Sequence, residues 1–328
     1  MSVLVTGGAG YIGSHMVAEL LNRNEDVVIL DNLEKGHKQA VLGGKFYQGD
    51  IRDSEILDKV FKENDIESVI HFAAASLVGE SVTEPLKYYN NNVYGTLCLV
   101  EKMREYKVDK LVFSSTAATY GEPENTPILE TDRTLPTNPY GETKLAIEKM
   151  LSWCTKAYGI RYVALRYFNA AGAHLNGAIG EDHRPETHLI PLILKVALGK
   201  QECIRIFGDD YNTPDGTCIR DYIHVTDLAV AHLLALDSLR NGGESTVYNL
   251  GNGMGFSVKE VIEAARQVTG HKIPEVIAPR RAGDPAILVA SSEKIKAELK
   301  WEPKYNDLHT IISSAWEWHK KHPDGYEE

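Results

Sequence analysis

Residues 3–13 read Val-Leu-Val-Thr-Gly-Gly-Ala-Gly-Tyr-Ile-Gly, a short apolar run followed at once by a glycine-rich loop. Apolar residues then recur at helical spacing, at Met16, Val17, Leu20 and Leu21. The stretch therefore predicts a buried strand, a tight turn and a helix. Glycine permits the turn and lets the backbone approach a pyrophosphate, which then lies on the amide-rich start of the helix. Two overlapping glycine fingerprints of dinucleotide-binding loops fit the stretch, namely Gly8, Gly10 and Gly13, or Gly7, Gly10 and Gly13.

A second buried strand, 27–30, ends in Asp31, 18 residues beyond Gly13. An acid at this place binds the ribose hydroxyls of the adenosine in dinucleotide-binding folds. A carboxylate there would repel the additional phosphate of NADP, so the sequence predicts NAD. A strand–helix–strand unit can also be purely structural. The strand before the loop, the helix after it and the acid together favour cofactor binding.

The alternation of strands and helices continues beyond Asp31. Further elements are expected at 45–48 (strand), 54–63 (helix), 68–75 (strand), 85–106 (helix) and 110–114 (strand). Repeated units of this kind, without a turn-dense β region, predict an α/β fold of the Rossmann type with a doubly wound parallel sheet. Ligands of such sheets lie at the carboxyl ends of the strands, where Asp50, Ile51 and residues 114–116 fall.

The alternation weakens after residue 170, and the sequence therefore predicts two domains. Residues 1–170 would form the NAD-binding Rossmann domain, and residues 171–328 a smaller α/β substrate domain. The segment near 221–240 reads as a strand, a helix N-cap and a helix, and it is the candidate to fold back onto the first domain.

Tyr140 and Lys144 lie four residues apart, on one face of a helix that Asn138 and Pro139 introduce. An ammonium beside a phenol stabilises the phenolate. Free tyrosine has a pKa of about 10, so a base that works near pH 7 needs roughly 4 kcal/mol of differential stabilisation. Such a pair also occurs by chance on surface helices. The dinucleotide loop at the N-terminus makes the catalytic interpretation the better one.

Composition excludes several classes of protein. The net charge of −11 opposes nucleic acid as a main partner. The four cysteines are far apart and indicate reduced thiols of a cytosolic protein. His183 and His188 share one stretch, but no carboxylate or cysteine pattern completes a metal site, so no metal is predicted. We find no signal peptide and no apolar run long enough to span a membrane. The expected location is the cytoplasm.

Several motifs together identify a family resemblance. They are residues 6–13, 31–33, 49–51, 71–74, 114–121, 140–144, 165–169, 208–225 and 279–284. With them the chain resembles, from end to end, the extended short-chain dehydrogenase/reductases, and within these the UDP-glucose 4-epimerases. The last three motifs are more specific than the glycines.

The resemblance implies a mechanism at C4 of a UDP-hexose, in galactose metabolism. Tyr140 as phenolate would remove the proton of the 4-hydroxyl while NAD takes the C4 hydride. The transient 4-ketopyranose would rotate and receive the hydride on its other face. Lys144 would lower the tyrosine pKa and bind the nicotinamide ribose, and Thr116 would hydrogen-bond the 4-oxygen. NAD would stay bound through the cycle.

The resemblance also assigns binding residues and a partner. The implied cofactor contacts are Gly7, Gly10, Tyr11, Ile12, Gly13, Asp31, Asn32, Asp50, Ile51, Phe72, Ala73, Ala74, Asn91, Ser114, Tyr140, Lys144 and Tyr167. The implied substrate contacts are Thr116, Tyr140, Phe168, Asn169, His188, Leu189, Arg205, Phe207, Arg220, Tyr222, Arg281, Asp284 and Leu288. Without the family, Arg220–Asp221 and Arg281–Asp284 could equally be surface ion pairs. The helices near 85–106 and 140–158 would form a homodimer face.

Three positions depart from the family pattern. Thr116 replaces the usual serine, Ser76 stands where many relatives have a lysine that contacts the cofactor phosphate, and Leu288 aligns with a bulky tyrosine of strictly hexose-specific relatives. The tyrosine's absence leaves room for an N-acetyl group, so the UDP-N-acetylhexosamines are candidate substrates too.

Other functions share parts of this pattern. A sugar-nucleotide 4,6-dehydratase needs an acid pair after Thr116, and Ala117-Ala118 cannot supply it. A uronate decarboxylase or an epimerase acting at another carbon fits residues 166–172 less well. A dinucleotide-sensing regulator would usually lose Tyr140 or Lys144, and both are present.

Overall fold

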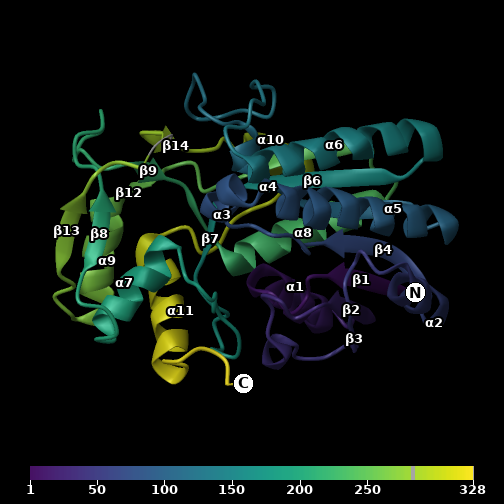
Figure 1. Cartoon of the computed structure of the whole chain (residues 1–328), viewed down its shortest axis with the longest axis horizontal. Helices are drawn as coiled ribbons and strands as arrows, with labels where there is room; N and C mark the ends of the chain where they lie inside the picture. Colours follow the sequence, from purple (N-terminus) through teal and green to yellow (C-terminus); the bar gives the residue numbers. More distant parts are fainter. Residues whose placement is uncertain (282–284, 328) are drawn as a thin grey trace.

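The structure, a computed structural model, describes residues 1–281 and 285–327. Its centre is a seven-stranded sheet in the order β11-β6-β5-β4-β1-β2-β3, with every neighbouring pair parallel (Figure 1). The strands are β1 Ser2–Thr6, β2 Val27–Asp31, β3 Lys45–Gln48, β4 Ile66–His71, β5 Lys110–Thr116, β6 Arg161–Tyr167 and β11 Thr246–Leu250. The predicted Rossmann-type sheet is confirmed.

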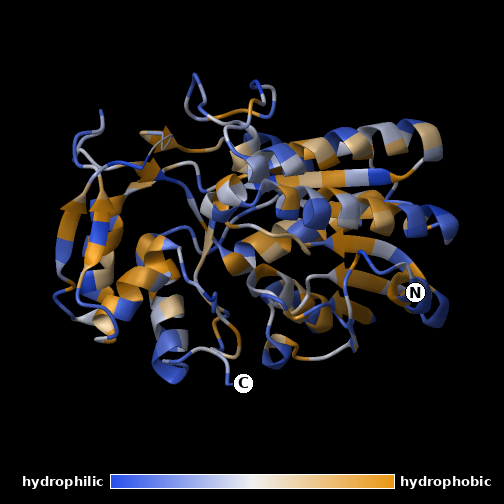
Figure 2. Cartoon of the chain, in the orientation of Figure 1, coloured by the Kyte–Doolittle hydropathy of each residue, from blue (hydrophilic) through white to orange (hydrophobic). Residues whose placement is uncertain are grey.

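Helices cover both faces of this sheet because successive side chains of a strand point to opposite faces. Val3 and Val5 of β1 pack with α1 (Tyr11–Asn22) and α8 (Val225–Arg240), whereas Leu4 belongs to the second core. This second core includes Leu4 of β1 and is covered by α2 (Ser54–Glu63), α5 (Gly95–Glu105) and α6 (Pro139–Tyr158). Figure 2 shows the strands of the large sheet as mostly hydrophobic and the helices as mixed.

The predicted long helix at 85–106 is a helical stretch in three parts. It comprises α4 (Pro85–Tyr88), a π-helical segment (Tyr89–Tyr94) and α5, and α3 (Val78–Thr83) precedes it. Asn92 lies in the π-helical segment and is fully buried. Its side chain accepts from the main-chain N–H of Ala75 and donates to the main-chain oxygen of Ala75 and to the Thr143 hydroxyl. This asparagine therefore links the main chain at Ala75 to Thr143 of α6.

The expected strand at 68–75 is wrong at its carboxyl end. β4 ends at His71, which pairs in register with Thr6, the last residue of β1. The main-chain N–H groups of Phe72 and Ala73 donate to Thr6 O at 2.9 and 3.1 Å. The chain therefore leaves the sheet after His71, because its partner strand ends there.

Smaller sheets and their helices form the second domain. The pairs are β7 (Asn169–Ala171) with β10 (Tyr222–His224), and β8 (Ile204–Phe207) with β13 (Glu275–Ala278). A third sheet has the order β12 (Phe256–Ser257), β9 (Ile219–Arg220), β14 (Ile287–Leu288). The helices are α7 (Leu189–Ala197), α9 (Val258–Thr269) and α11 (Leu308–Lys321), whereas α10 (Glu293–Leu299) packs against α8 and β11. Short 3-10 turns lie at Lys38–Ala40 and Ala117–Thr119.

Three segments from the C-terminal half, β11, α8 and α10, lie on or against the large sheet. β11 pairs with β6, and α8 packs against α1 and β5. The large sheet thus includes a strand from the range 171–328. No helix in the described part of the chain has both the length and the hydropathy needed to cross a membrane.

Candidate active site

A cavity of about 1070 Å³ runs along the carboxyl ends of the parallel strands toward the smaller sheets. Every predicted cofactor contact lines it, and so does every predicted substrate contact except two. Leu288 is half-buried in β14, where it pairs in register with Arg220, and it is not among the described lining residues. Asp284 lies outside the described residues. One cavity thus brings together residues from both predicted domains.

The glycine loop is shaped by contacts that no larger residue would allow. Gly7 has a φ of +74°, and a Cβ there would lie 2.6 Å from Ala73 N. A Cβ on Gly13 would lie 2.1 Å from Gly7 O. At Gly10, which lines the cavity, such a Cβ would lie 3.4 Å from Gly7 O. Gly10 is also the N-cap of α1, with no side chain over the free N–H groups of the helix. The cradle fits a pyrophosphate.

Asp31 stands at the end of β2, and only 7 % of its surface is exposed. Its Oδ2 accepts from Ala9 N at 2.9 Å and its Oδ1 from Leu33 N at 2.8 Å. Burial raises the pKa of this carboxyl and the two backbone hydrogen bonds lower it. Each oxygen retains a second lone pair, which fits ribose hydroxyls. Ser76, one of the three positions that depart from the family pattern, also lines the cavity.

Asp50 is oriented by polar neighbours. Its Oδ1 accepts from Arg52 Nε at 2.8 Å, and its Oδ2 accepts from Asn32 Nδ2 at 3.1 Å. The hydrogen bonds of Arg52 are the main reason that the pKa of Asp50 falls to about 2. This carboxylate therefore stays ionised at neutral pH.

Tyr140 and Lys144 lie in the first two turns of α6. Asn138 caps the helix by accepting from Gly141 N at 2.9 Å, and Pro139 occupies its first position. Tyr140 is half-buried, whereas Lys144 is only 3 % exposed. The small Gly141 lets this part of the helix approach Ala118 closely.

Burial dominates the electrostatics of this pair. It raises the pKa of Tyr140 to about 12, and a hydrogen bond with Thr116 partly offsets that rise. It also lowers the pKa of Lys144 to about 7, against a smaller opposing effect of Glu148. Both shifts favour the uncharged pair, so ionising the phenol requires a proton to pass to a neighbour or to solvent.

A buried network of polar side chains supports helix α6. Glu148 follows Lys144 by one turn, accepts from Ser115 Oγ at 2.5 Å and forms a buried ion pair with Arg166. Arg166 in turn donates to Tyr120 Oη at 2.9 Å, and Tyr120 donates to Asn249 Oδ1 at 2.6 Å. The network joins α6, β5, β6 and β11 directly behind Thr116.

The second domain supplies arginines and aromatic rings. The Arg281 guanidinium lies 3.9 Å from the centre of the Phe207 ring, and Arg220 lines the same cavity. Asn169 donates to Asp221 O at 2.8 Å. The Asp221 carboxylate is fully buried and accepts from three backbone N–H groups, those of Asn252, Gly253 and Ala290. The alternative of a surface ion pair at Asp221 is therefore wrong.

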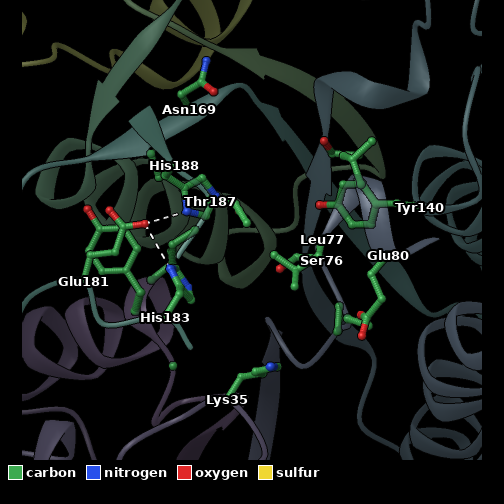
Figure 3. Close-up of a pocket in the computed structure, with 18 of the residues that line it drawn as sticks. Lys35, Ser76, Leu77, Glu80, Tyr140, Asn169, Glu181, His183, Thr187 and His188 are labelled. Carbon is green, nitrogen blue, oxygen red and sulfur yellow. Dashed lines mark ion pairs between the residues drawn. The ribbon is translucent and has the colours of Figure 1, made fainter. Parts of the chain in front are cut away.

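Sequence reasoning did not find a group of Glu and His side chains that could hold a metal ion, on the far side of the cavity from Tyr140 (Figure 3). It found no carboxylates to join the two histidines of one loop. The loop between β7 and α7 brings them together in what we call the Glu/His cluster, which consists of Glu181, His183, Glu186 and His188. The spacing Glu-x-His-x-x-Glu-x-His was visible in the sequence, but its convergence depends on the loop conformation.

Comparison with known proteins agrees with this site. Residues 3–251 match the NAD dependent epimerase/dehydratase family. A UDP-glucose 4-epimerase of Halalkalibacterium halodurans is 65% identical over 326 residues, covering 99% of this chain and 98% of that protein. A crystal structure of a UDP-glucose 4-epimerase has a TM-score of 0.99 at 63% identity, with both chains covered completely. Another, from Brucella ovis in complex with NAD, has a TM-score of 0.94 at 48% identity over 96% of this chain and 97% of that one. This chain belongs to the NAD dependent epimerase/dehydratase family and, within it, to the UDP-glucose 4-epimerases.

Proposed function

We propose that this chain interconverts UDP-galactose and UDP-glucose by inverting C4 of the sugar, with NAD as a retained cofactor. One observation carries the proposal. Tyr140, Lys144 and Thr116 line one cavity that extends from the glycine loop of α1 to Arg220 and Arg281 of the second domain. A UDP-hexose and a dinucleotide would therefore share one site.

The reacting oxygen would lie between two hydroxyl groups. Thr116, whose hydroxyl lowers the pKa of Tyr140, and Tyr140 itself would both hydrogen-bond the sugar 4-oxygen, and Tyr140 would accept its proton. NAD, when bound, accepts the C4 hydride and returns it. Tyr140 then gives the proton back to the 4-oxygen of the inverted centre. Lys144, fixed by donating to Ser114 O at 2.8 Å, would stabilise the phenolate.

The nucleotide would hold the ketone while the sugar turns. Arg220 and Arg281 are suited to clamp a diphosphate because guanidinium groups offer several donors in one plane. Phe207, on which Arg281 stacks, would lie by the uracil. Epimerisation needs the sugar free and the nucleotide fixed, so anchors far from C4 are what the reaction requires.

Domain division and assembly are further proposals. We propose that residues 1–170 form the cofactor domain, with 221–240 and β11 associated with it, and that most of 171–328 forms the substrate domain.

We also propose a homodimer through the helical segments 85–105 and 139–158. Exposed apolar side chains on these two segments support the homodimer: Leu86 is 82% and Trp153 68% exposed. The two segments also pack against each other within the chain. Trp153→Lys should then halve the mass measured by light scattering. The four free cysteines support a cytoplasmic location.

The decisive test is incubation of purified protein with UDP-galactose, without added NAD, followed by chromatography of the sugar nucleotides. We expect an equilibrium mixture with UDP-glucose and no net redox change. Unchanged UDP-galactose with NAD-replete protein, or a 4-keto-6-deoxy product, would contradict the proposal.

A further inference from the structure

The Glu/His cluster has the geometry of a metal site, which the proposed epimerase chemistry does not use. Its four ligand atoms all lie within 4.8 Å of one another. All four side chains come from one loop, which enters α7 at His188. Figure 3 shows Glu181, His183 and His188 turned toward one another at the wall of the cavity.

The distances within the cluster suit a tetrahedral ion. Glu181 Oε1 lies 3.1 Å from His183 Nδ1 and 2.9 Å from His188 Nδ1. Glu186 lies 3.6 Å from His183 Nδ1 through its Oε2 and 3.0 Å from His188 Nδ1 through its Oε1. Bonds of about 2.0–2.1 Å to a tetrahedral zinc ion separate the ligand atoms by roughly 3.3 Å. Three of the four contacts are slightly shorter than that value, and the fourth, made by the other oxygen of Glu186, is slightly longer.

Burial requires that the charges of both carboxylates be compensated within the cluster. Glu181 is 4 % exposed, and the Glu186 side chain 2 %. Glu181 Oε1 and His183 Nδ1 have no partner with hydrogen-bond geometry among the described residues, although they face each other. Within residues 1–281 and 285–327, the carboxylates of Glu181 and Glu186 form ion pairs with the imidazoles of His183 and His188. Two buried carboxylates need two positive charges close by, which either two protonated imidazoles or one divalent cation supplies.

The carboxylate of Glu186 is oriented by main-chain N–H groups of its own loop. Its Oε1 accepts from the main-chain N–H groups of Thr187 and His188, at 2.7 and 2.8 Å. Bonds of this kind fix a ligating carboxylate before the metal binds. On the other side, the Tyr11 ring meets His183 edge to face at a centroid distance of 6.1 Å.

We propose that the Glu/His cluster binds one divalent ion of the zinc class. Four protein ligands would close its coordination sphere, which is typical of a structural site. The ion would brace a loop that also contacts the cofactor side: Arg184 O accepts from Lys35 Nζ at 2.9 Å, and Asp182 O lies 3.0 Å from His37 Nε2. His188 would bind the ion through Nδ1 and keep Nε2 for the substrate side of the cavity.

The test uses the full chain, purified without a histidine tag and without chelators, with metal content measured by mass spectrometry. We expect about one zinc ion per chain. After removal of metal with EDTA, zinc sulfate should raise the melting temperature by a few degrees, and magnesium chloride should not. Glu186→Gln and His183→Gln should each weaken zinc binding at least about tenfold, as measured by calorimetry.

Matched controls come from a second Glu/His pair outside the cluster. His174 Nε2 lies 3.9 Å from Glu19 Oε1, so His174→Gln and Glu19→Gln make the same chemical changes and should leave zinc binding unaltered. Circular dichroism would show that each variant folds. The proposal is overturned if wild-type protein neither retains zinc nor melts at a higher temperature with it. It is also overturned if the controls lose zinc as much as the cluster variants do.

Discussion

The Lys144 ammonium lies 6.0 Å from the centre of the Tyr140 ring and donates to the main-chain oxygen of Ser114, 2.8 Å away. The main-chain carbonyl of Ser114 in β5 thus fixes the lysine amino group near the Tyr140 ring. Because Ser114 precedes Thr116 on the same strand, one strand end positions both partners of the tyrosine.

Tyr140→Phe removes the ionisable oxygen and keeps the ring. We expect kcat to fall by ~10² or more, because no other group takes the proton of the 4-hydroxyl. Affinity for UDP, measured by calorimetry, should be unchanged, because the nucleotide contacts lie elsewhere. Wild-type turnover in this variant would contradict the role of Tyr140 as base.

The pH profile should report the Tyr140/Lys144 pair. The pKa values of about 7 for Lys144 and about 12 for Tyr140 mean that the pair has lost one proton between these limits. That singly deprotonated pair includes the form with ammonium and phenolate. We therefore expect kcat/KM to rise through pH 7 and to stay level up to about pH 10.

Lys144→Met leaves the tyrosine to titrate alone. The rising limb of kcat/KM should then move to higher pH, and the loss of rate should be largest at low pH, where phenolate is scarcest. Rates measured from pH 6 to 10 decide this. A profile parallel to that of the wild type would show that Lys144 does not set the ionisation of Tyr140.

Glu148→Gln should reduce both stability and kcat. It breaks the buried ion pair with Arg166, and removing one partner of such a pair costs about 3 kcal/mol. Urea unfolding measures this free energy. Glu293→Gln is the control, because it removes an exposed ion pair with Lys296 and should cost less than about 1 kcal/mol. Equal losses in the two variants would contradict the supporting role of the Glu148 network.

Leu288 should influence substrate range. We expect the wild-type protein to interconvert UDP-N-acetylgalactosamine and UDP-N-acetylglucosamine as well, and Leu288→Tyr to suppress this activity more than that on the unacetylated pair. Leu288 pairs in register with Arg220, which lines the cavity. Ile287→Tyr is the matched control, because neighbouring strand residues point to opposite faces. Turnover of UDP-galactose without any turnover of the N-acetylated pair would refute the prediction.

The sequence by itself determined the Rossmann-type sheet, the cofactor loop and the pairing of Tyr140 with Lys144. These features depend on short separations along the chain: strand alternation, a glycine turn and the one-turn spacing of a helix. The N-cap at Asn138 follows from the same local rules. Such geometry is set by backbone sterics and hydrogen bonding, which neighbouring residues control.

The tertiary structure decided the rest. It ended β4 at His71 because β1 ends opposite it, and it put β11 into the large sheet beside β6. It also stacked Arg281 on Phe207 and closed the loop that forms the Glu/His cluster. Each of these contacts joins segments far apart in the chain or depends on a loop without periodicity. Their positions follow from the packing of the whole molecule, which no local pattern encodes.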